Sequence, residues 1–147
     1  MKTIQMLTVF AVLIFSVSIF AGDNMLKNNK DGVEQAITNY VKSVDSRNTD
    51  ELSKSLLSSG SVITVNNITN KLDHYSGSQF INLVKNGQKG GWVRNVAVNS
   101  VETVGNTATA KVEITDTRLK RTGFITLVND NGNWKVASEV TTLELNK

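Results

Sequence analysis

The sequence predicts a single α+β domain, in which a cone-shaped, curved antiparallel sheet (a hairpin plus a four-stranded meander) wraps on a long N-terminal helix with two shorter helices. Two observations lead to this fold class. Residues 92–145 contain four runs rich in Val, Thr, Ile and aromatic residues, and turn-forming residues separate these runs. All helical periodicities lie upstream of the meander, so the helices are expected to cover the apolar face of the sheet.

Residues 1–21 have the layout of a secretory signal peptide. Lys2 gives a positive start, residues 4–20 are almost wholly apolar, and Ala21 is a small residue before a possible cleavage site. The alternative is an uncleaved membrane anchor, since the apolar run is close to the minimum length for a span. The polar residues 22–24 and the extreme N-terminal position favour cleavage. We therefore expect bacterial export to the periplasm or the medium, with no membrane attachment after signal removal.

The composition excludes several classes of function. The signal peptide contains one of the 16 basic residues and none of the 13 acidic ones, so the remaining chain has a net charge of 15 − 13 = +2. This charge is too small to predict a nucleic-acid partner. The chain has no Cys, which excludes disulfides and thiol chemistry. With one His and no calcium-loop spacing of acidic residues, we predict neither a metal site nor a cofactor.

The first half of the domain is expected to be mainly helical. Residues 22–30 are polar and predict a flexible lead-in, so the domain proper is expected to span residues 31–147. Apolar residues recur at helical spacing up to about Arg47, which predicts the long amphipathic helix. Asn48 and Glu51 then have the spacing of a capping box, which predicts a second helix that ends at residues 58–60. The periodic residues of the long helix are Val33, Ile37, Tyr40, Val41 and Val44.

A hairpin and a third helix are expected to follow. Residues 61–65 and 71–75 are short alternating runs that predict two strands. Ser76 and Gln79 form a second capping-box pattern, and Asn86-Gly87 predicts the end of that helix. Residues 88–91 are glycine-rich and lead to Trp92, where the meander is expected to begin. Within the meander, breaks are expected at residues 104–106, 119–121 and 130–133, the last containing the hairpin-forming pair Asn131-Gly132.

With these elements in this order, the chain resembles the nuclear transport factor 2-like superfamily, and within it the putative lumazine-binding and SnoaL-like proteins. The resemblance covers residues 33–145, nearly all of the chain after the signal peptide. It implies the cone-shaped fold described above, but no single function, because that fold carries both enzymes and binding modules. The runs that carry it are VEQAITNY (33–40), YSGSQF (75–80), NTATAKV (106–112), FITLV (124–128) and GNWKV (132–136).

The resemblance also indicates where the chain differs from its relatives. Relatives often place an acidic residue just before the aromatic residue of the fifth strand, whereas this chain has Arg121-Thr122-Gly123 before Phe124. A role that the acid has in relatives is therefore not transferred to this chain.

His74 and Tyr75 are weak candidates for catalysis. Enzymes of the superfamily often combine His and Asp in the pocket, and His74 follows Asp73 directly. Neighbouring residues of a strand point to opposite faces, so these two cannot form a dyad. A half-exposed strand histidine is the more common situation.

Asp116 is a further candidate for a catalytic base. The apolar face of the fourth strand continues at every second residue to Asp116, which could therefore line the mouth of the cone. Desolvation there would raise the pKa of its carboxyl group. The alternative is that the strand has left the core before this point. The apolar face consists of Ala108, Ala110, Val112 and Ile114.

The leading functional hypothesis is an exported, non-catalytic binding module that holds a small, partly apolar ligand in the cone or mediates protein association. Its predicted ligand-binding residues are Tyr40, Phe80, Trp92, Asp116 and Phe124. The alternative is a SnoaL-like or steroid-isomerase-like enzyme that transfers a proton next to a carbonyl, with Asp116 as base and Tyr40 or Tyr75 as donor. An accessory or immunity-like protein without a ligand is a third possibility.

A homodimer is also expected. The third strand of the chain has apolar residues on both faces, and the helices can cover only one of them. A second subunit is a natural cover for the other face. Trp134 is expected in the core, on one face with Val136 and Val140.

Overall fold

The computed structural model describes residues 18–147, with side chains from Asn29 onward. It contains three helices, α1 (Ser18–Asp45), α2 (Thr49–Ser55) and α3 (Gly77–Lys85). Its six strands are β1 (Leu56–Asn66), β2 (Lys71–Ser76), β3 (Asn95–Val104), β4 (Thr107–Thr115), β5 (Leu119–Asp130) and β6 (Asn133–Leu145). The predicted α+β class and the order of elements are confirmed.

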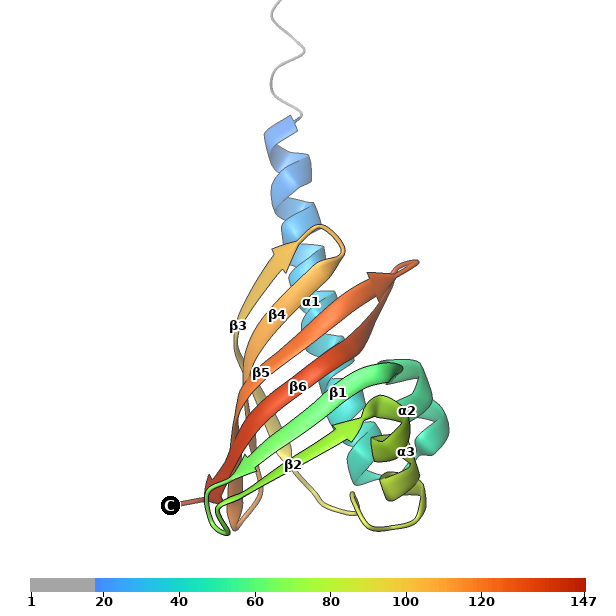
Figure 1. Ribbon diagram of the computed structural model, residues 1–147. Helices are drawn as coiled ribbons and strands as arrows, with labels where there is room; N and C mark the ends of the chain where they lie inside the picture. The colour runs from blue at the N-terminus through green and yellow to red at the C-terminus, as the bar shows by residue number, and fades with distance from the viewer. Residues whose placement is uncertain (1–17) are drawn as a thin grey trace, which may run out of the picture.

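All six strands form one curved sheet in the order β2-β1-β6-β5-β4-β3. The meander β3–β6 is antiparallel throughout, as is the β1–β2 hairpin. The hairpin joins the meander through β1, which runs parallel to β6. As Figure 1 shows, the sheet curves around α1, while α2 and α3 lie beside the hairpin end of the sheet.

The core lies between α1 and the inner face of the sheet. Every second residue of β4 is buried from Ala108 to Ile114, as the period of two predicts. These side chains belong to the same core cluster as the apolar face of α1. The buried residues of α1 are Val33, Ile37, Tyr40, Val41, Ser43 and Val44.

Both predicted capping boxes lie at helix starts. The Asn48 side chain accepts a hydrogen bond from the Glu51 backbone N–H at 3.1 Å, and Ser76 and Gln79 form both bonds of the reciprocal box at the start of α3. The predicted end of α2 at residues 58–60 is wrong, since α2 ends at Ser55. Leu56 already has extended backbone, is 1% exposed and pairs with Val136 of β6. Burial against the sheet therefore ends the helix early.

The N-terminal boundaries also differ from the prediction. Helix α1 begins at Ser18 and includes residues 22–30, for which we expected a flexible lead-in. Residues 1–17, which contain most of the predicted signal peptide, lie outside the described residues. Across the part of the chain that the structure describes, none of the helices is long and apolar enough to cross a membrane.

Candidate functional site

A small cavity lies inside the cone, between α1 and the inner face of the sheet. Its volume is about 20 Å³, which is room for about one water molecule. A second cavity of about 20 Å³ shares four of its lining residues and extends to the rim at Asp116. The first cavity combines aromatic side chains with buried polar ones: Tyr40, Val41, Val44, Val62, Thr64, Tyr75, Phe80, Lys89, Trp92, Arg94, Ile114, Arg121 and Glu139.

A β-bulge in β6 places Glu139 in this cavity. Thr126 pairs with Ser138, but Leu127 pairs with Val136, so Ala137 is an extra residue without a partner on β5. The extra residue shifts the alternation of β6 by one position. As a result Glu139 is 5% exposed, whereas Val140, expected to share the core face of Trp134, is 45% exposed.

Glu139 is held in the cavity by two hydroxyl groups. Tyr40 Oη donates a hydrogen bond to Glu139 Oε2 at 2.7 Å, and Thr141 Oγ1 donates to Oε1 at 3.2 Å. Burial raises the pKa of Tyr40 well above its ordinary value, and the neighbouring carboxylate raises it further. The phenol therefore remains a hydrogen-bond donor, and it fixes the orientation of the buried carboxylate.

Arg121 enters the same cavity from β5. Its Nη1 donates a hydrogen bond to Thr64 Oγ1 of β1 at 3.0 Å. Burial lowers the pKa of Arg121, and the nearby Glu139 opposes this change, so the guanidinium keeps its charge. Gly123 lies between Arg121 and Ile125 in the inward row of β5, where the backbone of β6 leaves no room for a side chain. A Cβ at Gly123 would meet the Val140 carbonyl oxygen.

A buried ion pair lies at the mouth of the cavity. Arg94 Nη2 is 2.6 Å from Asp45 Oδ1, the last residue of α1, and the two side chains are 9% and 12% exposed. The Arg94 guanidinium also lies over the ring of Trp92, 5.0 Å from its centre. Because Trp92 is 36% exposed, it lies between the cavity and solvent.

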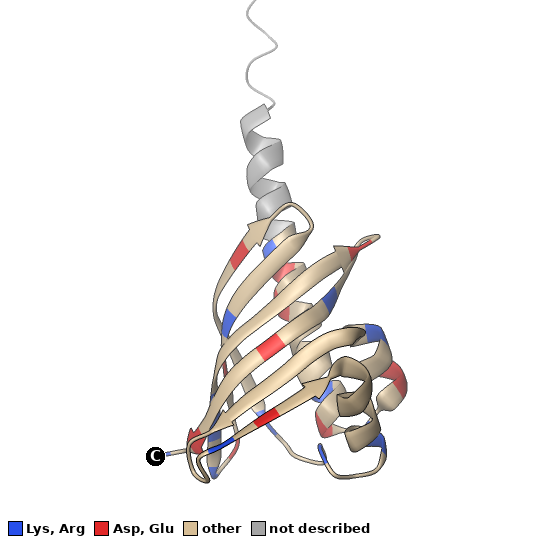
Figure 2. Cartoon of the chain, viewed as in Figure 1, with Lys and Arg blue, Asp and Glu red and all other residues tan. Residues whose placement is uncertain are grey.

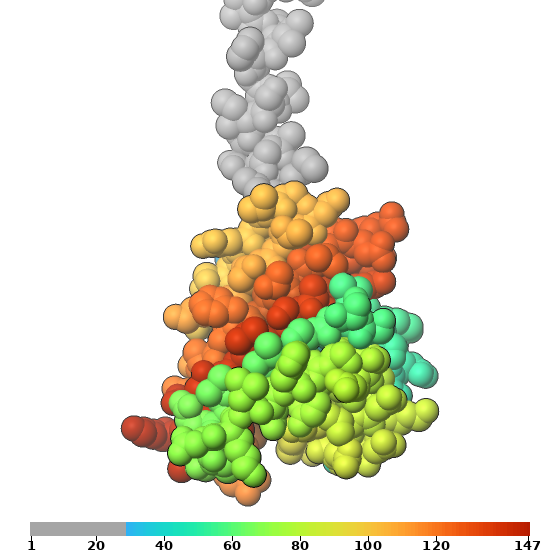
Figure 3. Space-filling model, viewed as in Figure 1, coloured from blue at the N-terminus to red at the C-terminus, as the bar shows by residue number. Residues whose placement is uncertain are grey.

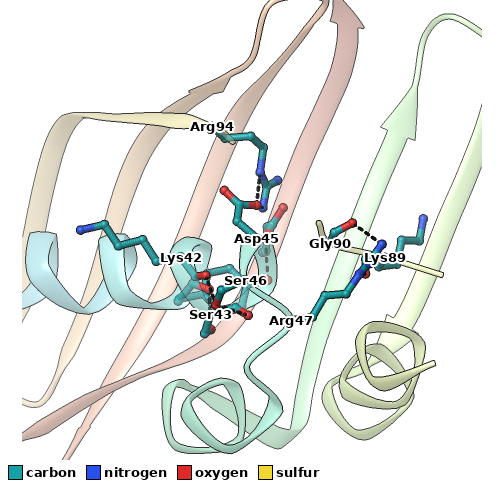
Figure 4. A network of polar contacts seen from close by, with 10 residues as sticks. Lys42, Ser43, Asp45, Ser46, Arg47, Lys89, Gly90 and Arg94 are labelled. Atoms are coloured by element: carbon teal, nitrogen blue, oxygen red, sulfur yellow. Dashed lines mark hydrogen bonds and ion pairs between the residues drawn. The ribbon is translucent and has the colours of Figure 1, made fainter. Parts of the chain in front are cut away.

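Arg47 holds the loop that precedes Trp92. Its guanidinium donates to the carbonyls of Gly87, Lys89 and Gly90 at 3.2, 3.3 and 3.0 Å. Figure 4 shows this network beside the Asp45–Arg94 pair. Gly90 has a φ of +80°, and a Cβ there would meet the Val44 carbonyl oxygen, so the loop packs directly on the end of α1.

Tyr75 and Phe80 form the aromatic side of the cavity, with ring centres 6.5 Å apart. Lys89 lies 5.4 Å from the centre of the Tyr75 ring and 3.7 Å from the Asp73 carboxylate. His74 is exposed on the opposite side of β2 and does not line the cavity. The structure thus separates His74 from Asp73 and Tyr75, as strand alternation predicts.

Phe124 was predicted to bind a ligand in the cone, and this prediction is wrong. It is 55% exposed and pairs with Val140 on the outer face of the sheet, because Ile125 and Leu127 occupy the inward positions of β5. Four of the five predicted ligand-binding residues do line the two cavities: Tyr40, Phe80, Trp92 and Asp116.

Asp116 lies at the rim, but the predicted rise of its pKa is wrong. Its Oδ1 accepts hydrogen bonds from the backbone N–H groups of Arg118 and Leu119, both at 2.8 Å. The bond from Arg118 is the main cause of a lowered carboxyl pKa, which the bond from Leu119 lowers further. Asp116 therefore stabilises the β4–β5 turn as an anion and is not a base with a raised pKa.

This contact predicts a pH-dependent contribution of Asp116 to stability. Because the folded-state pKa is depressed, the contribution is present above the ordinary value of 3.8 and is lost as the pH falls through the folded-state value. We expect Asp116→Asn to lower the free energy of unfolding at pH 7 by less than about 1 kcal/mol, since the group is exposed. Chemical denaturation of the unchanged chain and of Asp116→Asn at pH 7 and pH 3 measures the difference between their free energies of unfolding. We expect this difference to be smaller at pH 3, and an equal difference at both pH values would contradict the prediction.

Arg94, Arg121 and Glu139 were not among the site residues predicted from the sequence. Arg94 lies two and four positions before Val96 and Val98, which pack against the core, so strand alternation could have indicated its inward position. The burial of Glu139 could not be inferred in this way, because regular alternation places it outside. Among the described residues, no group of three or more His, Asp or Glu side chains is arranged to hold a metal ion.

A larger depression lies elsewhere on the surface, between α1, α2 and the β5–β6 turn. It has a volume of about 440 Å³ and is lined by residues such as Gln35, Asn39, Glu51 and Trp134. None of its lining residues is buried, and it is open to solvent. The cavity in the cone is therefore the better candidate for a specific site.

Comparisons with known proteins agree with the fold. A family model described as putative lumazine-binding matches residues 28–140. No curated protein sequence matches the chain. An NTF2-like protein of unknown function from Silicibacter pomeroyi has 16% identity and a TM-score of 0.67, with 82% of this chain and 98% of that chain covered.

Two further solved structures show the same likeness. An NTF2-like protein of unknown function from Methylobacillus flagellatus has 19% identity and a TM-score of 0.65, with 80% of this chain and 93% of that chain covered. An NTF2-like protein with a cystatin-like fold from Novosphingobium aromaticivorans has 14% identity and a TM-score of 0.64, with coverage of 88% and 91%. At these identities the likeness concerns the fold alone.

Proposed function

The chain belongs to the putative lumazine-binding family, and from this premise we propose that it is an exported binding module that holds a small, planar, partly apolar ligand in its cone. The observation that supports the proposal is the composition of the cavity wall. Aromatic rings from β2, α3 and the loop before β3 face a small set of buried polar groups from β5 and β6. Apolar walls with a few placed polar groups are typical of small-molecule sites.

A ligand larger than a water molecule needs space that the cavity of about 20 Å³ does not provide. The side chains at the mouth supply it when they move outward. Lys89 and Trp92 lie on or next to a loop with positive φ at Gly87, Gly90 and Gly91, and the Trp92 ring is already 36% exposed. In this proposal the ligand ring takes the place that the Trp92 ring leaves at the mouth of the cavity.

The contacts of the acidic and phenolic groups favour binding over proton transfer. An enzyme of the steroid-isomerase type needs a base and a phenol that are both free to face the substrate. Here the Tyr40 hydroxyl donates to Glu139, and Asp116 accepts two backbone N–H groups. The Tyr40 hydroxyl and the Asp116 carboxylate thus already have partners within the protein, which suits a fixed recognition surface.

Fluorescence titration tests the proposal directly, because the chain has two Trp residues, one of which lies at the mouth. In a Trp134→Phe variant the signal comes from Trp92 alone, and planar heterocycles that enter the cone are expected to change it. The Trp92→Phe variant is the control, since its remaining Trp134 lies outside the cavity. If the heterocycle changes the fluorescence of Trp134 in the control variant but not that of Trp92 in the Trp134→Phe variant, binding in the cone is contradicted.

We also propose that the chain forms a homodimer through the outer face of the sheet. The outer face of β3 is less apolar than expected, since the exposed Ala97 lies between the exposed Asn95 and Asn99, and Val101 packs against the core. Figure 2 shows few charged positions along the middle of the sheet, and Figure 3 shows the same face as an uninterrupted surface. An apolar strip crosses β2, β1, β6 and β5 instead: Leu72, Val65, Ile63, Val140 and Phe124.

The strip predicts that Phe124→Lys disrupts the dimer, because it places a charge in the middle of the proposed interface. Light scattering coupled to size exclusion at tens of micromolar protein is expected to give a dimer mass for the unchanged chain and a monomer mass for the variant. Val104→Lys is the control, since Val104 is 79% exposed at the β3–β4 turn, away from the strip. A monomer mass for the unchanged chain excludes the dimer.

Export with removal of residues 1–21 remains a proposal that rests on Lys2, the apolar run 4–20 and Ala21. N-terminal sequencing and intact mass of the protein from the periplasm or medium are expected to show a chain that begins near Gly22. A chain that begins at Met1 in the membrane fraction would show an anchor instead.

A further inference from the structure

The outer depression between α1, α2 and the β5–β6 turn has the size of a small-molecule site. Its volume of about 440 Å³ lies within the range usual for ligand sites. None of the residues that line it also lines either cavity of the cone. A ligand in the outer depression would therefore bind independently of the site proposed in the cone.

A row of polar side chains on α1 lines the outer depression. Asp31, Gln35 and Asn39 follow one another at intervals of four residues, so they lie on one face of the helix. Each interval is a rise of about 6 Å, and the whole row spans about 12 Å. All three residues are exposed, and within the described residues none of their side chains forms a hydrogen bond or ion pair with another protein group. Their polar atoms are thus available to a ligand.

Trp134 gives the outer depression an aromatic surface. Its ring packs partly against the core cluster, and its edge lies close to α1, since a Cβ at Gly32 would be 3.3 Å from Trp134 Cδ1. Ala36, one turn further along α1, is a second small residue of the lining. An indole held in this way is a rigid apolar surface beside the row of polar side chains.

The charges of the outer depression nearly cancel. Glu51 and Lys54 of α2 form an ion pair at 2.8 Å, so Asp31 is the one remaining charge in the lining. A negative charge disfavours anionic ligands, and an apolar ligand would remove water from the polar groups without replacing its hydrogen bonds. A carboxamide both donates and accepts hydrogen bonds, as a hydroxyl group does. Neutral hydroxyl groups therefore complement this lining.

We propose that the outer depression binds a neutral oligosaccharide. The C–H face of one sugar ring lies on the Trp134 indole, while hydroxyl groups exchange hydrogen bonds with the carboxamides of Gln35 and Asn39 and donate to the Asp31 carboxylate. The row of about 12 Å is longer than one sugar unit, so a short chain meets more of these groups than a single sugar does.

Protein NMR with matched probes tests this proposal, because the indole N–H signals of the two Trp residues report on the outer depression and on the cone separately. Cellotriose is expected to shift the Trp134 signal to saturation and to leave the Trp92 signal in place. Glucose is expected to bind about tenfold more weakly, since it forms fewer hydrogen bonds. Trigalacturonate, which has a carboxylate on each ring, is expected to bind about threefold more weakly than cellotriose because of Asp31.

Variants assign the binding to the row and the indole. We expect Trp134→Ala to weaken cellotriose by about tenfold and Gln35→Ala by about threefold, measured from the signals of the sugar itself. Asn82→Ala is the matched control, since Asn82 is an exposed carboxamide of α3 outside the depression, and its affinity is expected to be unchanged. Thermal unfolding establishes that each variant is folded, and Gln35→Ala, at an exposed position, keeps the test decisive if Trp134→Ala does not fold.

Several results would overturn the proposal. They are the absence of a Trp134 shift with cellotriose, a shift of the Trp92 signal alone, and equal effects of Gln35→Ala and Asn82→Ala. Equal affinity for glucose and cellotriose would exclude an oligosaccharide. Acetyl-Ser-Gly-Ser-amide has hydroxyl and amide groups but no sugar ring, so binding of this peptide as tightly as cellotriose would indicate a peptide site instead. None of these results affects the ligand proposed for the cone, which other residues line.

Discussion

Arg94→Ala is expected to lower the free energy of unfolding by about 3 kcal/mol. The substitution leaves the Asp45 carboxylate, which is 12% exposed, without its cation at the end of α1. Removal of one partner from a buried ion pair costs about 3–5 kcal/mol, because the remaining charge stays desolvated. The lower end applies here, since both side chains keep some contact with water. The loss of the Trp92 contact at 5.0 Å adds to the effect.

A surface ion pair between β5 and β6 provides the matched control. Lys120 and Glu144 are 3.2 Å apart, but their side chains are 32% and 46% exposed. Lys120→Ala is therefore expected to cost no more than about 1 kcal/mol. Urea denaturation of the two single variants and of the double variant Asp45→Asn/Arg94→Ala measures their free energies of unfolding. The double variant is expected to be more stable than Arg94→Ala, because it leaves no unpaired carboxylate. Equal effects of the two single alanine variants would show that the Arg94 pair behaves as a surface pair.

The local signals in the sequence predicted the elements well where the relevant contacts are close along the chain. The capping box of α3 needs only Ser76 and Gln79, and both bonds are present at 2.8 and 3.2 Å. The alternation of β4 is regular and gave the inner face correctly. The end of α2 was missed because it depends on the pairing of Leu56 with Val136, which are far apart in the sequence.

The candidate site was predicted only in part, for a related physical reason. The period of two places Val140 inside and Glu139 outside, and the bulge at Ala137 reverses both positions. The bulge lies next to Gly60, where β1 also shifts register and where a Cβ would meet the Ala137 carbonyl at 2.8 Å. Such an irregularity depends on two distant strands that adapt to one another, so alternation within one strand does not reveal it.

Long side chains are a second source of missed site residues. The guanidinium of Arg94 bonds a carboxylate 49 positions earlier, and that of Arg121 bonds a hydroxyl 57 positions earlier. A flexible chain of this length reaches several partners from one backbone position, so its sequence position alone does not choose among them. The compact aromatic residue Tyr40, by contrast, was placed by periodicity on the apolar face of the long helix, where it is buried.

Phe80→Ala is expected to affect mainly the stability of the domain, whereas Trp92→Ala is expected to affect mainly the mouth of the cavity. Phe80 is 8% exposed and packs in the core, so its truncation is expected to cost about 3–5 kcal/mol of stability. Trp92 is 36% exposed, so Trp92→Ala is expected to cost only about 1–2 kcal/mol while it removes the ring at the cavity mouth. Thermal and urea unfolding measure the two losses.

The binding experiment completes this comparison. If Trp92 lines a ligand site, folded Trp92→Ala protein is expected to bind a flat heterocycle at least tenfold more weakly than the unchanged chain, which corresponds to about 1.4 kcal/mol. Trp134→Ala, at the edge of the outer depression, is the control for loss of an indole outside the cone. If Trp92→Ala and Phe80→Ala both unfold the domain, the aromatic rings fill a closed core, and protein association through the sheet becomes the better account of the fold.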